Sequence, residues 1–109
     1  MIDKDKLRTA LKEAHTSALA ANVGDDGGSC NLDVATIKIP GIREATMKKI
    51  AQECGFRANK MAGWFWGGRF SLAPNFSTGC ASRNERVVTA ICAALKRHGF
   101  DEFPYRQMD

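Results

Sequence analysis

Two loops rich in small polar residues carry most of the groups in this chain that could bind a ligand. Residues 25–33 read Asp-Asp-Gly-Gly-Ser-Cys-Asn-Leu-Asp, and residues 74–81 read Pro-Asn-Phe-Ser-Thr-Gly-Cys-Ala. Glycine lets the backbone approach a ligand closely, and hydroxyl and amide side chains donate hydrogen bonds to ligand oxygens. These residue types favour binding of a small anion, although neither of the common glycine-rich phosphate motifs is present.

Each of the two loops also contains a thiol, Cys30 or Cys80, so covalent catalysis has to be considered. A cysteine nucleophile needs a nearby base or a positive environment that lowers its pKa. The two histidines, His15 and His98, fall on predicted helices away from the loops, and neither is placed to act as that base. Cys80, just before a predicted helix, is the one weak catalytic candidate, and we expect a binding protein rather than an enzyme.

The spacing of the cysteines does not favour a metal site. The chain has four cysteines, none of them in a Cys-x-x-Cys pair, and neither histidine forms a close ligand pair with a cysteine. Cys54 and Cys92 lie on predicted helices, where a small apolar thiol belongs in or near the core. We therefore expect no metal and no cofactor.

The composition indicates one globular domain over residues 1–109. The chain is 44% hydrophobic and 26% charged, with a formal net charge of +4 at pH 7. No apolar run is long enough to cross a membrane, and the charged beginning does not resemble a signal peptide. We expect a cytoplasmic protein without a membrane partner and with free thiols. Its positive charges are scattered, which is compatible with an anionic partner but forms no polybasic block.

Hydrophobic periodicity predicts the first three elements. A helix is expected over residues 3–21, a strand over 30–39 and a second helix over 42–54. The strand prediction rests on a β-branched and apolar run that ends at Pro40-Gly41. The first helix has one apolar face, formed by Leu7, Leu11, Ala14 and Ala18.

A β-hairpin is predicted next. Residues 59–66 and 69–73 flank Gly67-Gly68, and two glycines between aromatic runs are typical of a two-residue turn. That register brings Trp66 opposite Arg69 and Phe65 opposite Phe70, with Phe70 facing the core.

The chain is predicted to end with a helix and an edge strand. Ser82-Arg83-Asn84-Glu85 matches a capping box at the start of a helix that ends at Gly99. Residues 102–108 form the last strand. Pro104 cannot donate a ladder hydrogen bond, so this strand belongs at a sheet edge.

The resulting order, α-β-α-β-β-α-β, predicts an α+β fold. Without the first helix it is the ferredoxin-like βαββαβ sandwich, whose antiparallel four-stranded sheet has the order 4-1-3-2. We expect the N-terminal helix to occupy residues 1–22 and the βαββαβ unit to occupy residues 29–109.

In this topology both polar loops meet at one rim of the sheet, beside the start of the last helix and the end of the last strand. A helix start attracts anions, so we expect this rim to hold a small phosphate-bearing ligand such as a nucleotide. The alternative is that the loops are only turns. The predicted binding residues are Gly27, Gly28, Ser29, Asn31, Ser77, Thr78, Gly79, Ser82, Arg83, Arg86 and Gln107.

A second predicted surface is the outer face of the hairpin. Trp64, Trp66 and Arg69 share this face, and Trp66 and Arg69 are in position for a cation–π contact. Exposed tryptophan and arginine are typical anchors of protein interfaces, so this face could bind a protein partner. The alternative is that the N-terminal helix covers these residues with its apolar face.

RNA binding on the sheet is not expected. RNA-recognition domains of this topology stack bases on aromatic residues of the first and third strands. Here the first strand has no aromatic residue, and the third has only Phe70, which is assigned to the core.

Two segments, Asp-Gly-Gly-Ser-Cys-Asn-Leu-Asp at residues 26–33 and Tyr-Arg-Gln-Met-Asp at residues 105–109, resemble small uncharacterised proteins of phages and prophages. This resemblance implies no activity. It implies an accessory role in the cytosol of an infected bacterium, where such a protein either holds a ligand or blocks a host factor as an inhibitor or adaptor. The sequence does not predict an oligomeric state.

Overall fold

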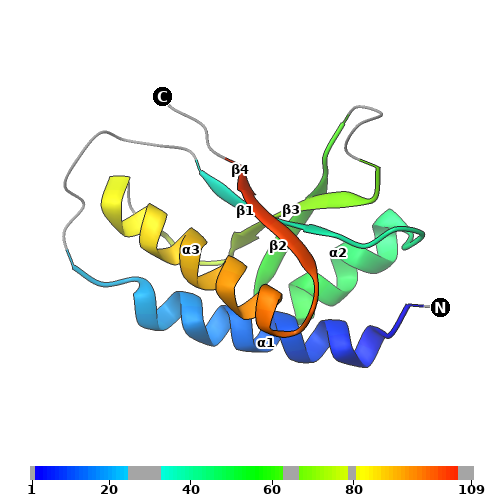
Figure 1. Ribbon diagram of the computed structural model, residues 1–109, viewed down its shortest axis with the longest axis horizontal. Coiled ribbons are helices and arrows are strands. Elements are labelled where there is room, and N and C mark those ends of the chain that lie inside the picture. The colour runs from blue at the N-terminus through cyan, green and yellow to red at the C-terminus, as the bar shows by residue number, and fades with distance from the viewer. Residues whose placement is uncertain (1, 25–32, 63–66, 79–80, 106–109) are drawn as a thin grey trace.

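The computed structural model describes residues 2–24, 33–62, 67–78 and 81–105 (Figure 1). Within these ranges three helices and four strands follow one another in the predicted order. Their bounds are α1 Lys4–Ala21, β1 Val34–Lys38, α2 Glu44–Glu53, β2 Phe56–Lys60, β3 Arg69–Pro74, α3 Ala81–Arg97 and β4 Asp101–Tyr105. None of the described helices has the length and apolar character needed to span a membrane.

The strands form one antiparallel sheet in the order β2-β3-β1-β4. This is the predicted order 4-1-3-2 read from the opposite edge, so both the α+β class and the strand order are confirmed. In the centre of the sheet Ile37 pairs with Phe70, and Thr36 pairs with Phe103. Pro104 lies on an edge strand as expected, because β4 pairs only with β1 among the described strands.

The helices all lie on one side of the sheet (Figure 1). α2 packs against β2 and α3 against β4 and β1, while α1 lies beneath α3 on the side away from the sheet. Asp3 caps α1, since its carboxylate accepts a hydrogen bond of 2.9 Å from the amide of Lys6. The predicted apolar face of α1 is buried, and Leu7 and Leu11 are fully covered.

The predicted register of the hairpin is wrong. β2 begins at Phe56, directly after α2, and ends at Lys60, so that Lys60 and not Phe65 lies opposite Phe70. The connection between the strands covers residues 61–68 in place of a two-residue turn. The aromatic run that predicted a strand therefore comes after β2, and Trp64, Phe65 and Trp66 lie outside the described residues.

The physical reason is that β2 is an edge strand with few apolar side chains. Its sequence is Phe-Arg-Ala-Asn-Lys, in which only Phe56 and Ala58 are buried. One buried face is enough to hold an edge strand, and a short alternation of this kind is a weak signal in a sequence. The predicted burial of Phe70 is nevertheless confirmed.

The start of α3 also differs from the prediction. The helix begins at Ala81, so Ser82 lies inside its first turn and is not the residue that precedes it. Its end agrees with the prediction, because Gly99 has a φ of +81° and follows the last turn.

The face of the sheet opposite the helices is closed by a cluster around Arg69. The guanidinium donates 2.9 Å to Thr36 Oγ1 and 2.8 Å to Asp101 Oδ1, and its central carbon lies 4.4 Å from the ring centroid of Phe103. Arg69 is only 8% exposed, so the alternative in which it is exposed is wrong. It is held by Thr36, Asp101 and Phe103 and not by the N-terminal helix, which lies on the other side of the sheet. The described aromatic partner of its cation–π contact is Phe103. The predicted partner, Trp66, lies outside the described residues.

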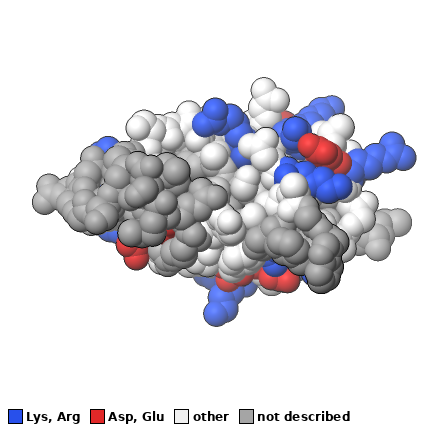
Figure 2. All heavy atoms as spheres, turned by 90° about the horizontal axis from the view of Figure 1, so that it is seen from above, with Lys and Arg blue, Asp and Glu red and all other residues white. Residues whose placement is uncertain are grey.

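Figure 2 views the molecule from the side opposite α1. The described Lys and Arg side chains lie mainly along the upper and right-hand parts of this view, with Asp and Glu side chains between and below them and an uncharged area in the centre. The scattered charge predicted from the sequence is therefore visible on this side. Phe103 and Tyr105 of β4 lie on the same face of the sheet as Thr36. These two aromatic residues were not considered in the RNA prediction, which examined only the first and third strands.

Candidate ligand site at the sheet rim

One end of the sheet contains a cavity of about 380 Å³. β1 and β2 begin at this end, β3 ends there, and α3 starts beside it. The beginning of β1, the end of β3 and the start of α3 were expected to meet at this rim, whereas the beginning of β2 was not. The cavity is lined by Asp33, Val34, Arg57, Leu72, Ala73, Pro74, Phe76, Ser77, Thr78, Asn84, Val87 and Val88.

The floor of this rim cavity is apolar because it opens onto the core. Leu72 of β3 lines the floor together with Val87 and Val88 of α3. All three side chains are buried. Phe76, half-buried in the loop after β3, packs against the core cluster and forms one wall. An apolar floor of this kind suits a flat or aliphatic part of a ligand.

Hydrogen bonds between side chains fix the polar wall. Thr78 Oγ1 donates 2.8 Å to Asn84 Oδ1, and Asn84 Nδ2 donates 3.1 Å to the carbonyl of Asp33. Asn84 is only 8% exposed, and through these bonds it ties the loop after β3 to the beginning of β1. The sequence predicted Thr78 at the site but not Asn84, whose position within the capping motif gave no sign of this role.

The loop that carries Ser77 is also tied to the end of α1. Asn22 follows the last turn of α1, and its Nδ2 donates 3.0 Å to the carbonyl of Ser77. Asn22 was predicted only as a helix stop. Its side chain makes the end of α1 a support for the rim cavity.

His15 is a second support that sequence reasoning missed. Its Nε2 lies 3.0 Å from Oδ1 of Asn75, and its ring makes edge contacts with Phe56 and Phe76 at centroid distances of 5.6 and 5.4 Å. The ring fits because residue 55 is glycine, whose missing Cβ would stand 2.5 Å from the imidazole. His15 therefore positions the loop wall, and the expectation that it lies away from both polar loops is wrong.

The arginines predicted as clamps do not line the rim cavity. Arg83 Nε donates 3.3 Å to the carbonyl of Thr78, and Arg86 donates to the carbonyl of Val23 at the end of α1. Arg86 and Ser82 instead line a shallow depression on the outer face of α3. The start of α3 thus contributes Asn84 to the cavity. Its two arginines instead donate hydrogen bonds to backbone carbonyls of neighbouring loops.

The cation at the cavity is Arg57 of β2. It lies opposite Ala73 in the sheet and is exposed to solvent. The sequence prediction began this strand at residue 59 and so assigned Arg57 to a loop. For this reason Arg57 was not predicted as a residue of the cavity.

Of the predicted ligand residues, Ser77 and Thr78 line the rim cavity. The others in the two loops and at the C-terminal end lie outside the described residues, as do the candidate nucleophile Cys80 and the tryptophans of the hairpin. These residues are Gly27, Gly28, Ser29, Cys30, Asn31, Trp64, Trp66, Gly79, Cys80 and Gln107.

The two described thiols lie in the core. Cys54 and Cys92 are buried, as predicted, and burial raises the pKa of the Cys54 thiol. Cys54 Sγ donates a weak hydrogen bond of 3.7 Å to the carbonyl of Arg8. No group of three metal-ligating side chains occurs within residues 2–24, 33–62, 67–78 and 81–105.

Comparisons with protein-family models, curated proteins and solved structures gave no match to this chain. The resemblance of two segments to phage proteins therefore stays a prediction.

Proposed function

We propose that this protein is a non-catalytic binding protein that holds a small phosphate-bearing ligand, of the nucleoside monophosphate class, in the rim cavity. We also infer that its βαββαβ unit is ferredoxin-like, given the element order and the strand order. The observation that carries the proposal is the combination, in one cavity, of an apolar floor with Arg57 and two hydroxyl side chains.

The size and lining of the cavity support a ligand of this class. Small-molecule sites measure roughly 300–1,000 Å³ and combine apolar walls with a few polar groups, and a cavity of about 380 Å³ falls at the small end of that range. A base or sugar packs against Phe76 and the buried side chains of the floor. Ser77 offers a hydroxyl within the same wall, and Thr78 Oγ1, whose proton is directed at Asn84, can accept a hydrogen bond from the ligand.

The charged residues of the lining favour one orientation of the ligand in the cavity. Arg57 attracts a phosphate and can form two parallel hydrogen bonds with it, whereas Asp33 repels it. The phosphate therefore lies toward Arg57, and the sugar or base lies toward Asp33, where a carboxylate can accept hydrogen bonds from hydroxyl or amino groups.

The alternative proposal, an inhibitor or adaptor that binds a host protein through Trp64, Trp66 and Arg69, has less support. Arg69 is held by Thr36 and Asp101 within the sheet and offers little surface to a partner. An anchor arginine at an interface needs an accessible guanidinium.

The test is titration of the protein with the four ribonucleoside monophosphates and their nucleosides, followed by calorimetry. We expect one nucleotide to bind more tightly than its nucleoside, and Arg57→Ala to weaken that nucleotide about tenfold or more by removing a charge-assisted contact. Lys60→Ala is the matched control, because Lys60 is an exposed cation on the same strand that does not line the cavity. Equal effects of the two substitutions, or no binding by any nucleotide, would contradict the proposal.

A further inference from the structure

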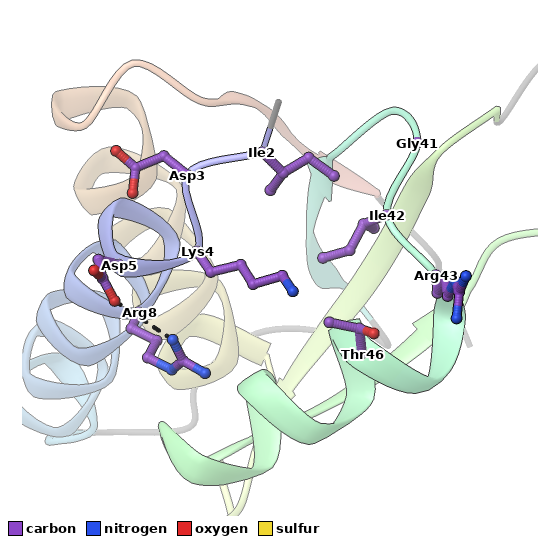
Figure 3. Close-up of a pocket in the computed structure, with 9 residues that line it drawn as sticks. All are labelled: Ile2, Asp3, Lys4, Asp5, Arg8, Gly41, Ile42, Arg43 and Thr46. Carbon is purple, nitrogen blue, oxygen red and sulfur yellow. Dashed lines mark ion pairs between the residues drawn. The ribbon is translucent and has the colours of Figure 1, made fainter.

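A larger cavity, of about 710 Å³, lies at the other end of β1 between the start of α1 and the start of α2 (Figure 3). It shares no lining residue with the rim cavity. Its polar lining comes from two helices that are far apart in the sequence. Those polar residues are Asp3, Lys4, Asp5, Arg8, Arg43 and Thr46.

Three cationic residues line this cavity from two sides. Lys4 and Arg8 are one turn apart on α1, and Figure 3 shows both pointing into the space between the helices. Arg43 stands at the start of α2 on the facing wall.

Three carboxylates stand near these cations, and two of them pair with Arg8. Asp3 accepts a hydrogen bond from the amide of Lys6, and its side chain turns away from the cavity in Figure 3. Asp5 is 97% exposed and lies 3.5 Å from Arg8 Nη1. Glu53 lies 3.2 Å from Arg8 Nε, so two carboxylates orient Arg8 from the outer side.

Hydrogen-bond donors are left over after these pairs are formed, although Lys4, Arg8 and Arg43 are balanced in number by Asp3, Asp5 and Glu53. A guanidinium has five N–H donors, so Arg8 keeps donors for a ligand beyond those directed at Asp5 and Glu53. Lys4 and Arg43 have no anionic partner within 4.0 Å in the part of the chain that the structure describes. Thr46, on the wall next to Arg43, adds a hydroxyl donor.

From these observations we infer that this cavity binds a small polyanion of the pyrophosphate class, held between Lys4 and Arg8 on one side and Arg43 and Thr46 on the other. The volume exceeds the needs of a single phosphate and matches that of small-molecule sites. A concave site with cations on two facing walls favours a compact anion, whereas an extended nucleic acid needs a continuous basic stripe. The site is independent of the one proposed at the rim.

The experiment is an amide NMR titration of the full chain with inorganic pyrophosphate, with inorganic phosphate in parallel. We expect saturable shifts at the beginnings of α1 and α2, and tighter binding of pyrophosphate than of phosphate. Lys4→Ala/Arg43→Ala should raise the dissociation constant for pyrophosphate about tenfold or more, since both charge-assisted contacts are lost. Both residues are exposed, so the fold of this variant is retained, which far-UV circular dichroism checks.

The matched control is Lys12→Ala/Lys49→Ala, which removes the same charge from exposed positions on the same two helices outside the cavity. Non-specific attraction would weaken equally in both double variants, and that outcome would overturn the site. So would shifts confined to the rim or the absence of saturable shifts at millimolar pyrophosphate. Arg57→Ala should leave pyrophosphate binding unchanged, which separates this site from the rim cavity.

Discussion

At the scale of single residues, Glu13 is the main ionic link between α1 and α3. Arg97 donates to its carboxylate at 2.9 and 3.2 Å, and Nε2 of His98 donates to the other oxygen. The hydrogen bond from His98, and next to it that from Arg97, holds the pKa of Glu13 below its usual range. A carboxyl with a lowered pKa stabilises the fold above its unfolded pKa, and that contribution is lost as the pH falls through the folded value.

We therefore predict that Glu13→Gln lowers the free energy of unfolding at pH 7 and makes it less sensitive to acid. The difference from the unsubstituted protein should shrink below about pH 4.3, the ordinary pKa of a glutamate, because the native carboxyl is then becoming protonated. Urea unfolding at a series of pH values measures this. Glu44→Gln is the control, since Glu44 pairs with Lys48 within a single helix. Identical pH profiles for the two variants would refute the assigned role.

Single residues also mark where sequence reasoning stops. Strand alternation is enough to set Arg69 and Phe70 on opposite faces, and it does so in the structure. Alternation does not reveal that the guanidinium is buried by its hydrogen bonds to Thr36 and Asp101, which belong to two other strands. Asn84 was missed for the same reason, because its partners Thr78 and Asp33 become neighbours only after folding.

At the scale of elements, the junction of α2 and β2 depends on the residue between them. Gly55 has a φ of +92°, and a Cβ at this position would stand 2.5 Å from the His15 ring. The close approach lets His15 reach Asn75 and Phe76, and so joins α1 to the loop that walls the rim cavity. A left-handed backbone costs an L-residue about 1–2 kcal/mol before any side-chain clash is counted.

We predict that Gly55→Ala destabilises the protein by this backbone cost plus about 1–3 kcal/mol for displacing His15. Gly41→Ala is the matched control, because Gly41 has a φ of +86° and nothing within 4 Å of its Cβ position. Chemical denaturation of both variants isolates the clash, and NMR shifts at Asn75 and Phe76 should accompany it only in Gly55→Ala. Equal losses in the two variants would show that the ring contact is unimportant.

The elements that the sequence predicted well are those with long periodic patterns. The helix at Lys4–Ala21 and the end of the last helix at Gly99 were predicted because many residues repeat the same signal. β2 failed because the run Trp-Phe-Trp before the two glycines has a stronger strand propensity than Phe-Arg-Ala-Asn-Lys. In the structure residues 56–60, and not the aromatic run, pair with β3. This pairing places Arg57 in the lining of the rim cavity.

At the scale of the whole molecule, the strand order follows from the order of elements and from Pro104. Once β1 and β3 are central, the two ends of β1 lie in different surroundings. The rim cavity lies where β1 begins, and the larger cavity between the starts of α1 and α2 lies where β1 ends. The sequence predicted the first location from its two polar loops. It did not predict the second, because Lys4 and Arg43 are separated by most of the first half of the chain.

The extra helix α1 belongs to the same folding unit as the sheet. Its residues Leu7, Leu11, Ala14 and Ala18 are fully buried in one cluster with the apolar residues of the strands and of α3. Arg8 and Glu13 add contacts with α2 and α3 on either side. A helix attached only as an appendage would unfold separately, whereas a shared core makes unfolding cooperative.

We predict that Leu11→Ala destabilises the whole domain by about 2–5 kcal/mol, the usual cost of truncating a buried leucine. Leu19→Ala is the control on the same helix, because Leu19 is 51% exposed, and its truncation should change the free energy of unfolding by less than about 0.5 kcal/mol. Native-state hydrogen exchange separates the two possible origins of the effect. If α1 shares the core, Leu11→Ala accelerates exchange of the central amides of β1, such as that of Ile37, as much as those of α1. If only the α1 amides lose protection, the helix is an independent appendage and its packing against α3 does not hold the sheet together.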